Sequence, residues 1–178
     1  MLYFAYGSNL DTDQMRSRCP DAVAGPSATL PDHALVFTGM SRRWGGAVAS
    51  VTPAAGFEVH GRLWELSPED LAVLDRFEGH PAVYHRVDRT VVDRSGARHH
   101  VQVYMVPKAR LAVGRPSPEY LALIRAAYRS LGFDAATLGP DDGGECSREP
   151  ERSDAAAHAR ADGDSLDAHR GSRTNRRE

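Results

Sequence analysis

The chain opens with a short apolar run that ends at a turn. Residues 2–6, Leu-Tyr-Phe-Ala-Tyr, predict a buried strand, and Gly7 permits a backbone conformation that other residues rarely adopt. Ser8 or Asn9 can cap the helical segment that follows. Such a turn directs backbone N–H groups towards one point, which suits a carboxylate or an oxyanion. The alternative is a plain connection between two elements.

Hydrophobic periodicity predicts a mixed domain in the rest of the chain. Ser-Pro pairs at 67–68 and 117–118 mark two helix starts, and residues 93–96 have the composition of a hairpin turn. Helices are expected at 11–18, with Asp11 or Thr12 as the cap, at 68–78 and at 118–131. Strands are expected at 34–37, 46–52, 57–66, 84–92 and 99–106. Because consecutive strands often lack helices between them, we expect an α+β fold: a small mixed, largely antiparallel β-barrel with a few packed helices.

Composition changes sharply after Phe133. From residue 141 to residue 178 the only large aliphatic side chain is Leu166, so this stretch cannot bury enough apolar surface to offset the entropy of ordering. We therefore expect one folded domain over residues 1–135 and a disordered polar tail over residues 136–178.

Charge and cysteine content narrow the class of protein. A formal net charge of −2 provides no field that would draw the chain to nucleic acid or to a membrane surface. There is no apolar run of about 18 residues and no secretory signal pattern. Cys19 and Cys146 are far apart in the sequence, so they suggest neither a metal site nor a disulfide framework. We expect a cytoplasmic protein.

Glu78 occupies an unusual position for an acid. It shares a helix face with Leu71 and Leu74, and it lies in the last turn before Gly79. There the helix dipole disfavours a negative charge by about 0.3–1 kcal/mol, and partial burial acts in the same direction. Both effects raise the pKa of Glu78 towards the range useful to a general base or acid. In the alternative interpretation, Glu78 points outward and pairs with Arg76, His80 or Arg86.

Six motifs, in order and spacing, carry a resemblance to a known family. They are Tyr3–Leu10 (YFAYGSNL), Trp44-Gly45-Gly46, Gly61-x-Leu63-Trp64, Leu74-Asp75-x-x-Glu78-Gly79, Tyr84 and Ser117-Pro118-x-Tyr120. Together they resemble the γ-glutamylcyclotransferase family and span essentially the whole expected domain. Residues 77–86 also resemble γ-glutamylamine cyclotransferases and plant AIG2-like proteins.

The resemblance implies a fold of that family and an intramolecular reaction. The α-amine of a γ-glutamyl compound attacks its own γ-carbonyl, which forms 5-oxoproline and releases the attached amino acid or amine. Such a reaction needs no protein nucleophile, no metal and no cofactor. The implied partner is a small-molecule γ-glutamyl substrate, with no nucleic acid and no membrane, and the protein is expected to be a monomer or a homodimer.

The resemblance also assigns roles to residues. Glu78 matches the catalytic Glu, which takes a proton from the substrate amine and gives it to the leaving amine. The expected substrate-binding residues are Tyr3, Phe4, Ala5, Tyr6, Gly7, Ser8, Asn9, Tyr84 and Tyr104. For each tyrosine, the alternative is core packing with the hydroxyl bonded elsewhere.

Several alternatives stay open at this point. The leaving group is an amino acid or an amine, and the arginines at 42–43 form either a solvated loop or a contact with a distal carboxylate. A catalytically inactive γ-glutamyl-binding or regulatory module of the same fold is a second hypothesis. An amide hydrolase with Cys19 as nucleophile is a third, although no partner base is evident near Cys19.

Overall fold

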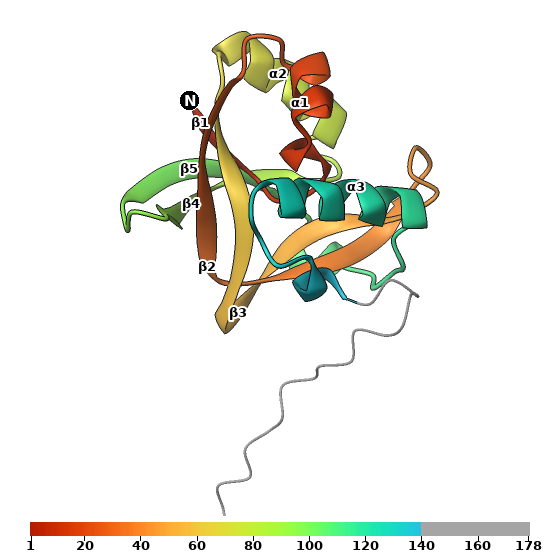
Figure 1. Ribbon diagram of the computed structural model, residues 1–178. Coiled ribbons are helices and arrows are strands. Elements are labelled where there is room, and N and C mark those ends of the chain that lie inside the picture. The colour runs from red at the N-terminus through yellow and green to blue at the C-terminus, as the bar shows by residue number, and fades with distance from the viewer. Residues whose placement is uncertain (140–178) are drawn as a thin grey trace, which may run out of the picture. The chain divides into compact units, whose positions relative to one another are not determined.

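A closed five-stranded barrel forms the centre of the protein. The computed structural model describes residues 1–139, and its strands follow the order β1-β3-β2-β4-β5 around the barrel (Figure 1). The strands are β1 (Leu2–Ala5), β2 (Val23–Ser41), β3 (Gly46–Glu65), β4 (His85–Asp93) and β5 (Arg98–Met105). All pairings are antiparallel except that of β1 with β5, which closes the barrel in parallel through Tyr3 and Gln102. The expected mixed, largely antiparallel barrel is confirmed.

The second and third α-helices begin where the sequence predicts, at Pro68 and Pro118, and the first begins at Thr12, one residue after its predicted start. They are α1 (Thr12–Arg18), α2 (Pro68–Glu78) and α3 (Pro118–Ser130), with short 3-10 turns η1 (Ser8–Leu10), η2 (Lys108–Arg110) and η3 (Ala135–Leu138). The side chains of Asp11, Ser67 and Ser117 cap the three α-helices by accepting a backbone N–H. In Figure 1, α1 and α2 lie together above the barrel and α3 crosses its long strands.

The predicted division into strands is wrong between residues 23 and 65. Instead of three short strands, β2 and β3 are two continuous strands of 19 and 20 residues. Register shifts near residues 24–27, 31–33 and 38–41 let this pair bend around the barrel. Pro53 pairs with His33 and does not interrupt the ladder. Local turn residues therefore mark bends here and not strand ends.

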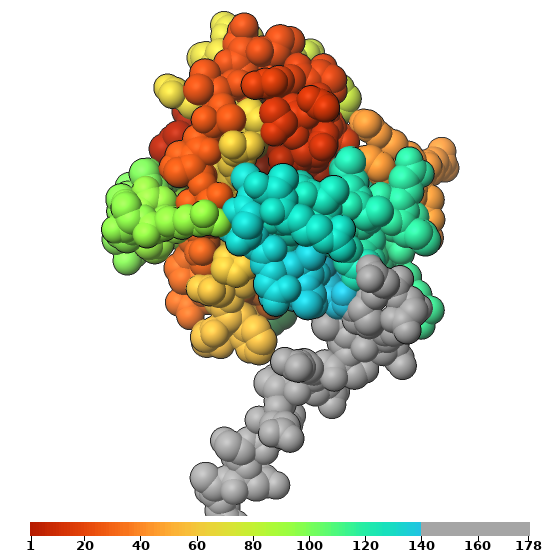
Figure 2. All heavy atoms as spheres, viewed as in Figure 1, coloured from red at the N-terminus to blue at the C-terminus, as the bar shows by residue number. Residues whose placement is uncertain are grey.

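Aromatic and aliphatic residues of β1, β3 and α3 fill the barrel. Phe4, Trp64 and Ile124 are fully buried, and α3 with the residues after it covers one face of the strands (Figure 2). Leu138 also joins the core, three residues beyond the expected domain boundary, whereas residues 140–178 of the expected tail lie outside the described part of the chain. No helix among residues 1–139 is long and apolar enough to cross a membrane.

Candidate active site

A cleft of about 550 Å³ opens beside the end of α2. Its walls come from the turn after β1, the β2–β3 loop, the end of α2 with the segment that follows it, and the start of α3. The residues used below are Ser8, Arg18, Arg43, Trp44, Arg76, Glu78, Tyr84, Arg110 and Tyr120. Glu78 is the only carboxylate among the described residues that line the cleft.

Glu78 continues the buried face of α2, as its spacing predicts. Leu71 and Leu74 are buried, and the Glu78 side chain is 17% exposed. Its Oε1 accepts a hydrogen bond from Asn9 Nδ2 at 2.9 Å and lies 3.4 Å from Arg18 Nη1. The alternative pairings with Arg76, His80 or Arg86 are therefore wrong, because the cation that contacts Glu78 comes from α1.

The pKa of Glu78 is raised above its ordinary value. Burial is the main cause, since it penalises the charged carboxylate. The positive charge of Arg18 and the hydrogen bond from Asn9 oppose the rise. The predicted direction is confirmed, with burial as the leading cause. The negative charge of Glu78 in turn raises the pKa of Tyr84 and Tyr120, behind the larger effect of their own burial.

The turn after β1 differs from its predicted form. Gly7 has a φ of −108°, outside the left-handed region. Glycine fits because a Cβ there would lie 3.3 Å from Ala49 Cβ. Neither Ser8 nor Asn9 caps a helix: residues 8–10 form their own 3-10 turn without a side-chain cap, so the α1 cap falls on Asp11. Asn9 is thereby free to bond Glu78 with its side chain.

The backbone donors of the turn are largely engaged within the protein. The N–H groups of Leu10 and Asp11 bond the carbonyls of Gly7 and Ser8. The Tyr120 hydroxyl accepts the Ala49 N–H at 3.1 Å, and the backbone and side chain of Ser8 lie next to it and act to lower the pKa of Tyr120. The turn therefore contributes Ser8 to the cleft, where it lies beside Tyr120 of α3.

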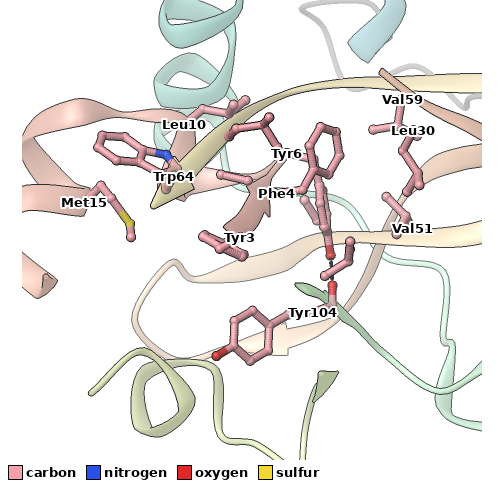
Figure 3. Close-up of a cluster of buried hydrophobic side chains, with 14 of the residues drawn as sticks. Tyr3, Phe4, Tyr6, Leu10, Met15, Leu30, Val51, Val59, Trp64 and Tyr104 are labelled. Carbon is pink, nitrogen blue, oxygen red and sulfur yellow. Dashed lines mark hydrogen bonds between the residues drawn. The ribbon is translucent and has the colours of Figure 1, made fainter. Parts of the chain in front are cut away.

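The four candidate tyrosines differ in their surroundings. The Tyr6 hydroxyl donates to the Tyr104 carbonyl inside the barrel (Figure 3). The Tyr104 hydroxyl donates to Asp75 at 2.7 Å, and that of Tyr84 to the Ala49 carbonyl at 2.7 Å. Tyr3 accepts from Asn9 at 3.0 Å. Of these four, only Tyr84 lines the cleft.

The other residues expected to bind substrate also fall into two groups, those that line the cleft and those buried behind it. Ser8 and Glu78 line the cleft. Phe4 and Ala5 have no exposed surface, and Gly7 and Asn9 connect β1 to the cleft wall. The structure thus brings Ser8, Tyr84 and Glu78 together, and leaves the side chains of β1 behind them as support.

Sequence reasoning gave no site role to Arg18 or Tyr120. Tyr120 lies in the first turn of α3, and its pKa is raised to about 12, chiefly by burial, so it remains a donor at neutral pH. Arg18, the last residue of α1, is buried beside Glu78. An arginine at the end of a helix is common, so the sequence offers no signal that Arg18 contacts Glu78. Tyr120 belongs to the Ser117-Pro118-x-Tyr120 motif, from which a site role could have been inferred.

Two other kinds of site find little support. Cys19 is fully buried, and burial raises the pKa of its thiol to about 11, so a thiolate nucleophile is disfavoured there. The two tryptophans also differ in position: Trp64 lies in the core, whereas Trp44 lines the cleft together with Arg43. Within residues 1–139, no three His, Cys, Asp or Glu side chains gather as a metal site requires.

Comparisons with known proteins agree with this architecture. Residues 3–122 match the family model described as γ-glutamyl cyclotransferase, AIG2-like. The γ-glutamylcyclotransferases of Mus musculus and Homo sapiens are 36% and 33% identical over 137 residues, which is 74% of this chain and 72% of each relative. A solved structure named γ-glutamyl cyclotransferase has 30% identity and a TM-score of 0.70, covering 74% of this chain and 80% of that one. The chain therefore belongs to the γ-glutamyl cyclotransferase, AIG2-like family and is an enzyme of the cyclotransferase type.

Proposed function

We propose that this enzyme converts γ-glutamyl amino acids to 5-oxoproline and the free amino acid, with Glu78 as general base and acid. The observation that carries the proposal is a single carboxylate of raised pKa in the wall of a cleft, near the Ser8–Tyr120 pair. A base whose pKa is raised towards neutrality can both accept and return a proton.

The proton follows a closed path in this mechanism. Glu78 takes a proton from the substrate α-ammonium group, and the free amine attacks the γ-carbonyl carbon to form the ring C–N bond. As the tetrahedral intermediate collapses, the bond to the leaving nitrogen breaks and that nitrogen receives the proton from Glu78. The ring nitrogen still carries two protons, so the Glu78 carboxylate takes the second one and passes it to the released amine, which departs as an ammonium group. The carboxylate is then regenerated, and no group on the protein is covalently altered.

Ser8, Tyr84 and Tyr120 have the chemistry to hold the γ-glutamyl moiety. Tyr120 keeps its proton at neutral pH, and the Ser8 hydroxyl lies beside it, so the pair can donate to a carboxylate or to the developing oxyanion. Tyr84 adds a wall on the Glu78 side of the cleft. Residues Tyr3–Ala5 of β1, together with Tyr6, Gly7 and Asn9 after it, support this wall from behind. Tyr104 contributes by holding Asp75.

Arginines favour an amino acid as the leaving group over an amine. Arg43, Arg76 and Arg110 line the cleft in addition to Arg18, so the cleft offers cations to a second carboxylate. Arg43 stacks over Trp44, with its guanidinium carbon 5.3 Å from the ring centroid, and comes from the β2–β3 loop. A γ-glutamyl amine has no carboxylate to use these cations.

The test compares matched substrates that differ only in that carboxylate. Purified enzyme is incubated with γ-glutamyl-leucine and with γ-glutamyl-isoamylamine, and 5-oxoproline is quantified. We expect turnover of the amino-acid conjugate with kcat/KM about tenfold or more above the amine, and a smaller ratio in Arg43→Gln. Equal turnover of the two would contradict the leaving-group assignment. No 5-oxoproline from either would favour a binding or regulatory module.

A further inference from the structure

Arg18 is buried directly behind the acid of the cleft. It ends α1, and its side chain is 7% exposed. Nη1 donates to Asn9 Oδ1 at 2.7 Å and lies 3.4 Å from Glu78 Oε1. The guanidinium carbon lies 4.8 Å from the centroid of the Phe77 ring, a cation–π distance. The guanidinium is therefore fixed by α2 on one side and by the turn after β1 on the other.

Asn9 connects this guanidinium to the carboxylate. Its Oδ1 accepts from Arg18 and from Gln14 Nε2 at 3.3 Å. Its Nδ2 donates to Glu78 Oε1 and to the Tyr3 hydroxyl. Because Oδ1 faces two donors and Nδ2 faces two acceptors, the amide can take only this orientation.

Both contacts reach the same oxygen of Glu78. Asn9 and Arg18 bond Oε1, and the described residues give no hydrogen bond to Oε2. A carboxylate held at one oxygen has its other oxygen available to a ligand in the cleft. The two oxygens of Glu78 are thus made chemically different by α1 and the turn.

The arrangement is costly for the fold. Nε of Arg18 is buried and has no hydrogen-bond partner among residues 1–139, and leaving a buried donor unsatisfied destabilises the fold. Burial also lowers the pKa of Arg18, an effect that the charge of Glu78 opposes. A shorter apolar side chain would avoid this cost, so stability alone does not account for an arginine here.

We propose that Arg18 is a positioning residue, which together with Asn9 holds Oε1 of Glu78 so that Oε2 exchanges the proton with the substrate and the leaving amine. This rests on the proposed function, in which Glu78 is the general base and acid. In the proton transfer, the Oε2–H bond forms as an N–H bond of the α-ammonium breaks. It breaks again as the leaving nitrogen takes that proton. Oε1 keeps its two donors throughout.

The charge of Arg18 acts among other titratable groups that face Glu78. Tyr3 faces it from β1, Tyr6 from just after β1, Tyr84 from the segment before β4, and Tyr120 from α3. All four have a raised pKa and are neutral near pH 7, so they add no charge there. Three further arginines line the cleft at positions 43, 76 and 110. Among the described residues, Arg18 is the cation that contacts the Glu78 carboxylate directly.

The test compares Arg18→Gln with Arg62→Gln. Arg62 is a matched control because it also contacts α1, through Thr12 Oγ1 at 3.3 Å, and lies over Trp64. Loss of Arg18 removes an attraction that favours the charged carboxylate, so the acid limb of the kcat/KM profile should move to higher pH. Misplacement of Oε2 should also lower kcat about 100-fold. Arg62→Gln should leave the acid limb in place.

A second variant, Arg18→Lys, and a second measurement, the NMR titration of Glu78, allow the proposal to be tested even if Arg18→Gln does not fold. Arg18→Lys retains the charge and should keep the acid limb near its wild-type position, and it carries the test if the Gln variant does not fold. Titration of the Glu78 carboxyl carbon by ¹³C NMR, assigned with Glu78→Gln, reports the same ionisation without substrate. A lower kcat with an unmoved acid limb and an unmoved NMR titration would overturn the proposal. So would an equal shift in Arg62→Gln. If wild type forms no 5-oxoproline, the proposed function fails, while the NMR titration still decides whether Arg18 controls Glu78.

Discussion

Helix α2 carries two acid–arginine pairs, one turn apart, that are built differently. Asp75 uses both oxygens: Oδ2 lies 2.7 Å from Arg86 Nη1, and Oδ1 accepts from the Tyr104 hydroxyl at 2.7 Å. Glu78 uses one oxygen, with Arg18 at the longer distance of 3.4 Å. The Asp75 pair is about a quarter exposed on each side, whereas Arg18 is almost fully buried.

The difference separates an acid that holds the structure from one available for chemistry. Asp75 joins α2 to β4 and β5 through short hydrogen bonds, so both of its oxygens are engaged by the protein. Glu78 is less completely bonded and borders the cleft, and burial raises its pKa. Two acidic residues of the same helix therefore have different roles. The difference is that the protein bonds both oxygens of Asp75 but only one oxygen of Glu78.

The largest contrast is expected in activity. Glu78→Gln should lower kcat about 1000-fold or more, because the amide cannot carry the proton. Asp75→Asn, the matched acid-to-amide change on the same helix, should keep kcat within about tenfold of wild type. Both are measured as 5-oxoproline released from a γ-glutamyl amino acid. Equal losses in the two variants would remove the distinction between the pairs.

For folding stability we expect the opposite order, with the larger loss in the Asp75 variant. Asp75→Asn leaves Arg86 without its charged partner and weakens the bond to Tyr104, so we expect a loss of about 1–2 kcal/mol in the free energy of unfolding. Urea denaturation at pH 7 measures it. The exposed Glu58→Gln serves as control, with a change within about 0.5 kcal/mol. An Asp75→Asn protein as stable as wild type would show that this pair does not hold α2 to the barrel.

The smallest effect is a pH-dependent gain in stability for Glu78→Gln. Because the folded-state pKa of Glu78 is raised, its stabilising contribution is complete below the unfolded pKa, about 4.3, and is lost as pH rises through the folded pKa. The Gln variant does not ionise and escapes that loss. Its unfolding free energy relative to wild type should therefore increase between pH 5 and pH 8. A difference that is constant with pH, or that falls, would contradict the raised pKa.

Sequence patterns predicted the elements with strong local signals and missed long-range geometry. The Ser-Pro helix starts and the hairpin at 93–96 depend on neighbouring residues, and the structure has them. The bend of β2 and β3 depends on barrel closure, which no short window encodes. The barrel class nevertheless followed, because the order of strands and helices limits the architecture.

The sequence predicted the part of the candidate site in which a charged residue stands at a position that favours an apolar or basic one. Glu78 stood out as an acid on an apolar stripe at a helix C-terminus, and it lines the cleft. Its partner Arg18 is 60 residues away in sequence, and only the packing of α1 against α2 brings them together. The hydroxyl directions of Tyr6 and Tyr104 likewise follow from packing across the barrel.

The most direct test of the central claim is whether the ionisation of Glu78 controls the rate. The acid limb of kcat/KM for a γ-glutamyl amino acid is compared with the titration of the Glu78 carboxyl carbon in the free enzyme. We predict that the two midpoints coincide, above the ordinary range for Glu, and that the residual activity of Glu78→Gln shows no such limb. A Glu78 titration in the ordinary range, or an acid limb that survives in Glu78→Gln, would contradict its role as the proton carrier.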